Sequence, residues 1–102
     1  MIIVHGVNRV RDGVDREQVR GVLSAMALAS RTEPGCRAYR FAFDVEDDRV
    51  VHLQEEWEDE FALVAHFDTP HMATFRDAVE DLVAGPTDLV VFEASERALP
   101  EM

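Results

Sequence analysis

The chain has 102 residues, 47% of them apolar and 30% charged, which is the composition of one globular domain able to bury its own core. Its 21 acidic and 10 basic residues give a net charge of −11, which argues against binding to nucleic acids or anionic membranes. No apolar run approaches the roughly 20 residues of a membrane-spanning helix, no signal peptide is evident, and the single cysteine, Cys36, excludes an internal disulfide. The sequence therefore predicts one acidic domain over residues 1–102, located in the cytoplasm.

The first two predicted elements are a strand and a helix. Apolar and polar residues alternate over residues 2–11, which predicts a strand. Asp15, with Gln18 three residues later, predicts the N-cap of a helix that runs to about Arg31. One face of the strand would hold Ile2, Val4, Gly6, Asn8 and Val10, and the helix would pack through Val19, Val22, Leu23, Met26 and Ala27.

Two further strands are predicted over residues 36–45 and 49–58, and the short polar turn between them indicates an antiparallel hairpin. Both faces of these two strands are predicted to carry large apolar side chains, so both faces of the hairpin should be covered. A carboxylate on an apolar face needs a partner, so Glu55 is expected to pair with Arg37 or Arg40. The large apolar side chains are Phe41 and Phe43 on one strand and Val50, Val51, Leu53 and Trp57 on the other.

The remaining elements are two short helices and a last strand. Residues 58–67 predict one helix, and Thr69 as N-cap with Pro70 at the first helical position predicts a second. This second helix is expected to end before Gly85-Pro86. Residues 88–95 predict the final strand, followed by a loose tail.

The element order is β-α-β-β-α-β, which predicts an α+β fold with a ferredoxin-like sheet and its helices on one face. The other face needs a cover of its own, because an open apolar sheet of this size would not stay exposed to water. The simplest cover is a second copy of the chain, packed sheet against sheet. We therefore expect a two-fold homodimer, a dimeric α/β barrel.

Two stretches, 33–41 (EPGCRAYRF) and 51–75, resemble the antibiotic biosynthesis monooxygenase family. Its members share a Gly-Cys-x-x-Tyr motif, a Glu-x-Trp motif that ends the third strand, and a His followed by a small residue, Pro and His. In this sequence those positions are Gly35, Cys36, Tyr39, Glu55, Trp57, His66, Thr69, Pro70 and His71. The resemblance implies a homodimer with one pocket per subunit, between the sheet and the helices.

Several activities occur among the proteins that this pattern resembles. They include quinol monooxygenases, polyketide-modifying monooxygenases, an isomerase of a signalling sugar phosphate and haem-degrading oxygenases. In the haem-degrading pattern Asn8 fits, but His66 and Arg76 stand where that branch has Trp and its haem-ligating His. In the polyketide-modifying pattern Trp57 fits and Arg76 falls near the helix Arg, but Leu53 stands in place of an Asn.

The implied reaction uses no cofactor: a phenol or quinol is deprotonated, and its anion passes an electron directly to dioxygen. A base with a pKa near neutrality suits the first step, and the ordinary pKa of His is roughly 6.5. We therefore predict that His66 accepts the proton and that Asn8 and Arg76 stabilise the anion. The predicted contacts to the substrate ring come from Trp57, Tyr39 and His71.

Each of these residues also has a simpler structural interpretation. His66 would pack or hydrogen-bond locally, His71 would cap its helix or lie on the surface, and Trp57 and Tyr39 would be core or interface residues. Asn8 would bond to neighbouring backbone, and Arg76 would pair with Glu80. The alternative functions are a non-catalytic small-molecule-binding dimer of the same fold, or an isomerase or haem-degrading enzyme.

No metal site is predicted. His66 and His71 are separated by a helix break, and no third ligand follows at usable spacing. The expected partners are a small aromatic substrate, dioxygen and a second copy of the chain.

Overall fold

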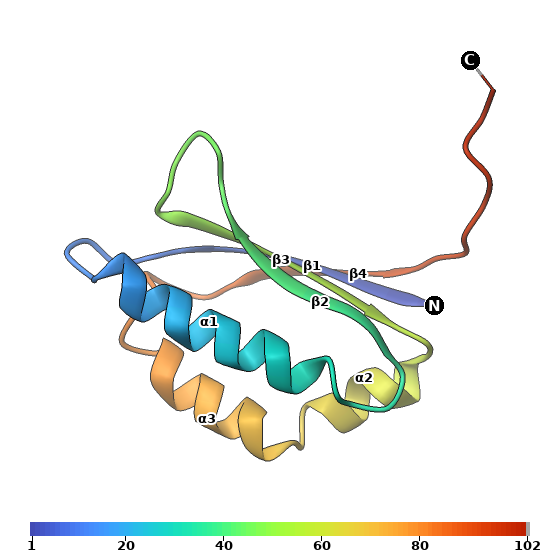
Figure 1. Ribbon diagram of the computed structural model, residues 1–102, viewed down its shortest axis with the longest axis horizontal. Coiled ribbons are helices and arrows are strands. Elements are labelled where there is room, and N and C mark those ends of the chain that lie inside the picture. The colour runs from blue at the N-terminus through green and yellow to red at the C-terminus, as the bar shows by residue number, and fades with distance from the viewer. Residues whose placement is uncertain (102) are drawn as a thin grey trace.

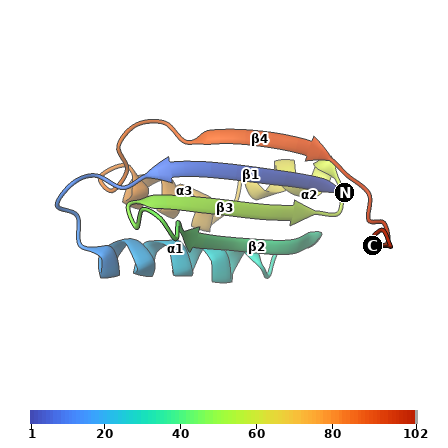
Figure 2. The ribbon, with the colours of Figure 1, turned by 90° about the horizontal axis from the view of Figure 1, so that it is seen from above.

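The computed structural model describes residues 1–101, which form a four-stranded antiparallel sheet and three helices. The elements are β1 (Ile2–Arg9), α1 (Arg16–Ser30), β2 (Cys36–Phe43), β3 (Val50–Trp57), α2 (Glu60–His66), α3 (Pro70–Val79) and β4 (Asp88–Glu93). The strand order is β2-β3-β1-β4, and the helices lie on one side of the sheet (Figure 1 and Figure 2). The predicted ferredoxin-like α+β arrangement is confirmed.

The helices begin where side-chain caps predict. Asp15 accepts a hydrogen bond from the backbone N–H of Glu17 at the start of α1, and Asp59 accepts one from Ala62 in α2. Thr69 caps α3 with Pro70 in its first turn, as expected from the sequence. No helix of residues 1–101 combines the length and apolar character needed to cross a membrane.

Helix α3 is shorter than the sequence predicts, because it ends at Val79 and not just before Gly85. The chain leaves the helix to pair with the end of β1: Val83 forms an isolated bridge with Val10, and the Ala84 N–H donates to the carbonyl of Arg9 at 2.8 Å. These backbone bonds compete with continued helix and bring the chain back to the sheet.

The core lies between the sheet and the helices. Residues of β1, β2 and β3 alternate between this core and the opposite, open face, in the registers that join Val4 to Glu55 and Tyr39 to Glu55. The core-facing large side chains of β2 and β3 are Tyr39, Phe41, Phe43, Val51, Leu53 and Trp57.

The prediction that both faces of the β2–β3 hairpin carry large apolar groups is therefore wrong. Of those side chains only Val50 lies on the open face, because its neighbour Val51 points into the core. The apolar surface of the open face comes from β1 and β4 instead. It consists of Ile3, Val7, Val90 and Phe92, of which the last three are exposed.

Candidate functional site

Three polar side chains meet where α1, α2 and α3 come together. His66 is the last residue of α2, His71 lies in the first turn of α3, and Glu33 lies in the loop that follows α1. The Glu33 Oε2 atom is 2.6 Å from His66 Nδ1 and 2.6 Å from His71 Nε2. One carboxylate oxygen therefore joins two imidazoles from different helices.

Local structure holds these groups in place. Gly35 has φ +83°, and a Cβ atom there would lie 2.6 Å from the Cβ of Ala62, so only glycine fits this turn against α2. The Thr69 hydroxyl donates to the carbonyl of His66 at 2.8 Å and fixes the corner between α2 and α3. The turn at Gly35 and the corner at Thr69 thus help to position Glu33, His66 and His71.

The hydrogen bond to Glu33 determines how His66 is protonated. A carboxylate only accepts hydrogen bonds, so Nδ1 of His66 is the donor and Nε2 of the neutral ring is an acceptor. Burial lowers the pKa of His66, although the hydrogen bond to Glu33 acts in the opposite direction. The Nε2 atom is buried and has no hydrogen-bond partner within residues 1–101.

Aromatic side chains pack against the His66 ring. The ring centroid of His66 is 4.8 Å from that of Trp57 and 5.4 Å from that of Tyr39. All three residues are almost completely buried. The structure therefore brings together four of the six predicted site residues, Tyr39, Trp57, His66 and His71, and adds Glu33, which sequence reasoning missed.

Glu55 is the second buried acid of this region. The predicted ion pair with Arg37 or Arg40 is wrong: Arg37 pairs with Glu96, and Glu55 accepts a hydrogen bond from Trp57 Nε1 at 2.9 Å. Desolvation is the main cause that raises the pKa of Glu55 to about 7, and the indole hydrogen bond only partly opposes it. Burial likewise raises the pKa of Tyr39.

Asn8 lies at the opposite end of the sheet. It pairs with Val51 in the β1–β3 ladder, whereas Trp57 pairs with Ile2, six residues away, or about 20 Å along the strands. The Asn8 amide donates to the hydroxyl of Thr87, and its oxygen accepts from the N–H of Arg9. Asn8 and His66 do not face a common space in this structure.

Arg76 is an exposed residue of α3. The predicted pair with Glu80 is absent, since no ion pair of Arg76 occurs in the described part of the chain. Its positive charge makes a minor contribution to lowering the pKa of His66, behind the dominant effect of burial. Arg76 thus influences the charge state of His66 at a distance and forms no ion pair with Glu33 within residues 1–101.

Two hollows lie near α3. A cavity of about 80 Å³ between the sheet and the helices is lined mostly by apolar residues, among them Leu53 and Phe75, and also by Asn8, Arg9 and Thr87. An open groove of about 330 Å³ between α1 and α3 is lined by His71, Met26 and Phe75. Phe75 belongs to both linings, so it lies between the cavity and the open groove.

Glu33, His66 and His71 are also a donor set that could hold a metal ion, because their ligand atoms lie within 4.8 Å of one another. Two imidazoles and a carboxylate suit Zn²⁺ or Fe²⁺. However, ligands around a tetrahedral Zn²⁺ stand about 3.3 Å apart, given metal–ligand distances of about 2.0 Å. The 2.6 Å distances from Glu33 to the two imidazole nitrogens are those of hydrogen bonds, so the structure shows these three residues in a hydrogen-bonded arrangement.

Comparison with known proteins supports the fold and the family pattern. Residues 1–78 match the family model described as "Antibiotic biosynthesis monooxygenase". The uncharacterised protein sll1783 of Synechocystis is 30% identical over 95 residues, which are 93% of this chain but only 64% of that protein. A Mycobacterium tuberculosis protein named "Putative monooxygenase Rv0793" is 30% identical over 83 residues, 81% of each chain. The solved structure of Rv0793 matches with a TM-score of 0.84 at 26% identity, covering 96% of this chain and 98% of that one.

Proposed function

The chain belongs to the antibiotic biosynthesis monooxygenase family, and we propose that it oxidises a small electron-rich phenol or quinol with dioxygen, without a metal or a flavin. One observation carries this proposal. His66 is a buried imidazole that is oriented by a carboxylate through Nδ1, keeps Nε2 without a partner among residues 1–101, and packs against two aromatic rings. A base oriented by an acid is the arrangement that proton abstraction requires.

In this proposal Nε2 of His66 accepts the proton of the substrate hydroxyl, and Glu33 stabilises the imidazolium that forms. The substrate anion gives an electron to dioxygen, and the two radicals combine to a peroxide. His66 returns its proton to the peroxide, the carbon that carries the peroxide loses its hydrogen as the O–O bond breaks, and one oxygen atom stays as a carbonyl while the other leaves as water. The walls of Trp57 and Tyr39 exclude bulk water from the anion.

The substrate must gain access by a movement of α3. The cavity of about 80 Å³ is smaller than the several hundred Å³ of ordinary ligand pockets, and Trp57 and His66 do not line it. Helix α3 has no fully buried residue, so less packing holds it than holds α1. Rotation of Phe75 would join the cavity to the groove beside His71, and would bring Asn8 into the same space.

We also propose that the protein works as a homodimer. Val7, Val90 and Phe92 leave an apolar patch on the open face of the sheet, and β4 is exposed along its whole length. A second copy placed sheet against sheet would bury this patch at the two-fold axis. The dimer supports the reaction by fixing the sheet that carries Trp57.

The test is oxygen uptake with a panel of quinols and anthrone-like phenols, after treatment of the protein with chelator. Uptake above autoxidation that is lost in His66→Ala supports the proposal. The matched control is His52→Ala, since His52 forms a similar pair with Asp44 at 2.7 Å on the surface. Uptake that is equal in wild type and His66→Ala would show that His66 is not the base.

The second candidate is a non-catalytic small-molecule binder. It is favoured by the open groove of about 330 Å³ beside His71, because a ligand could occupy this groove without reaching the fully buried His66. Saturable binding of a panel member to the full chain, with no oxygen uptake at any concentration, would favour this reading over the enzyme.

A further inference from the structure

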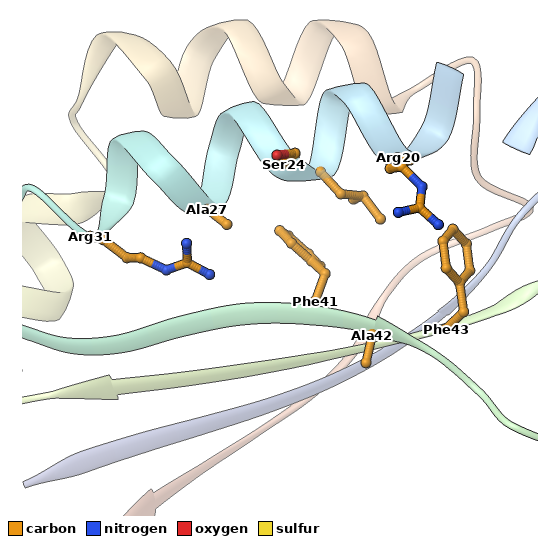
Figure 3. Close-up of a pocket in the computed structure, with 8 residues that line it drawn as sticks. Arg20, Ser24, Ala27, Arg31, Phe41, Ala42 and Phe43 are labelled. Carbon is orange, nitrogen blue, oxygen red and sulfur yellow. The ribbon is translucent and has the colours of Figure 1, made fainter. Parts of the chain in front are cut away.

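A separate groove runs along the edge of the sheet, between α1 and β2, on the side away from α3 (Figure 3). Its volume is about 310 Å³, which is the lower end of the range for small-molecule sites. The lining consists of Arg20, Leu23, Ser24, Ala27, Arg31, Phe41, Ala42 and Phe43. None of these residues belongs to the His66 cluster.

The spacing of residues in α1 creates this groove. Arg20, Ser24, Ala27 and Arg31 follow one another at intervals of four, three and four residues, which places them on one face of the helix. The two small residues leave the centre hollow, and the two arginines stand at the ends. Figure 3 shows the Arg31 side chain extending toward Phe41, and that of Arg20 toward Phe43.

The charge at Arg31 is not balanced by an acid. Its Nε donates to the backbone carbonyl of Tyr39 at 2.9 Å, and no ion pair of Arg31 occurs among residues 1–101. This is notable in a chain with 21 acidic and 10 basic residues. The ion pair of Arg20 found within residues 1–101 is with Glu17, at 3.5 Å and with both side chains largely exposed, so this pair is weak.

We propose that the groove binds a small planar aromatic carboxylate, at a site distinct from the His66 cluster. The ring would lie against Phe41, and the carboxylate would receive hydrogen bonds from the terminal nitrogens of Arg31. Arg20 would add a second positive charge at the far end. An apolar floor between two cations selects an aromatic anion over a neutral ring or an aliphatic acid.

The experiment is a calorimetric titration of the full chain with 1-hydroxy-2-naphthoate, and with its neutral carboxamide as the uncharged probe. Arg31→Gln keeps a donor for the Tyr39 carbonyl but loses the charge. Ser24→Leu fills the hollow, and the fold should tolerate it because Ser24 is exposed. Arg40→Gln is the matched control, because Arg40 is an exposed arginine of β2 outside the groove.

We expect one acid molecule per chain, and an affinity about 10-fold or more weaker in Arg31→Gln, from the loss of a charge-assisted hydrogen bond. Ser24→Leu should abolish binding, Arg40→Gln should bind like wild type, and the carboxamide should bind at least about 10-fold more weakly than the acid. Absence of binding, equal binding of the carboxamide, or equal binding by Arg31→Gln would each overturn the proposal. A change in the molar mass of Ser24→Leu in solution would also overturn the proposal, because it would identify the groove as an interface between two copies of the chain. None of these readouts depends on oxygen uptake.

Discussion

Replacement of Glu55 by Gln should stabilise the protein at neutral and alkaline pH. Burial raises the pKa of Glu55 from 4.5 to about 7, so the folded chain holds this proton more tightly than the unfolded chain. The stabilisation from this proton is complete below pH 4.5 and is lost as the pH rises through about 7. At about 1.4 kcal/mol per pH unit, the loss is about 3 kcal/mol. Gln stays neutral, and its carbonyl still accepts the hydrogen bond from Trp57.

The assay is urea unfolding of wild type and Glu55→Gln between pH 4 and pH 8.5, monitored by the fluorescence of Trp57. The difference in free energy of unfolding should grow in favour of Glu55→Gln by about 3 kcal/mol across this range. Glu56→Gln is the control, because it removes the same charge one residue away, on the open face of the sheet. If the difference in free energy of unfolding between the two proteins did not change with pH, or if Glu55→Gln were less stable than wild type at pH 8.5, the raised pKa of Glu55 would be refuted.

Four further predictions concern the site and the assembly. Glu33→Gln should lower turnover by about 10²–10⁴-fold, because His66 loses the anion that holds its tautomer, and the ¹⁵N shifts of His66 would show the change without substrate. Phe75→Ala should cost about 2–4 kcal/mol in urea unfolding and should admit bulkier panel phenols, measured by calorimetry. Phe92→Asp should yield a monomer by light scattering, since it places a charge in the exposed apolar patch; an unchanged dimer would move the interface elsewhere. Removal of metal ions by EDTA should leave oxygen uptake unchanged, and a loss restored by Zn²⁺ or Fe²⁺ would contradict the cofactor-independent reaction.

The fold could be predicted because its signals are local. Asp15 and Thr69 cap helices through bonds to residues two or three positions later, and period-two alternation assigns Val4 and Trp57 to the core side. The end of α3 could not be predicted in this way. It is set by backbone pairing of Val83 with Val10, a contact between residues far apart in the sequence.

In the candidate site, too, the residues with a local sequence signal could be predicted, and those placed by distant contacts could not. Trp57 and His66 stood out by residue type and family pattern, but Glu33 reaches His66 across 33 positions and His71 across 38. No periodicity connects such residues, although Glu33 directly precedes the Pro-Gly turn that places it. Glu55 was expected to form an ion pair with an arginine, because a charged carboxylate in an apolar core needs a positively charged partner. The structure satisfies it with an indole N–H and a raised pKa instead.

In the proposed reaction, the two ends of the sheet would supply complementary halves of a site. The His66 end would provide the base and aromatic walls but has no open space beside His66, whereas the Asn8 end has a mostly apolar cavity whose lining also includes Arg9 and Thr87. Phe75 and Leu53 both line this cavity. Nε2 of His66, which has no partner among the described residues, destabilises the fold, since an unsatisfied buried acceptor costs about 1–3 kcal/mol. In the proposed reaction, a phenol that displaces Phe75 would supply the missing donor to Nε2, so the unsatisfied nitrogen and the proposed rotation of Phe75 belong to one hypothesis.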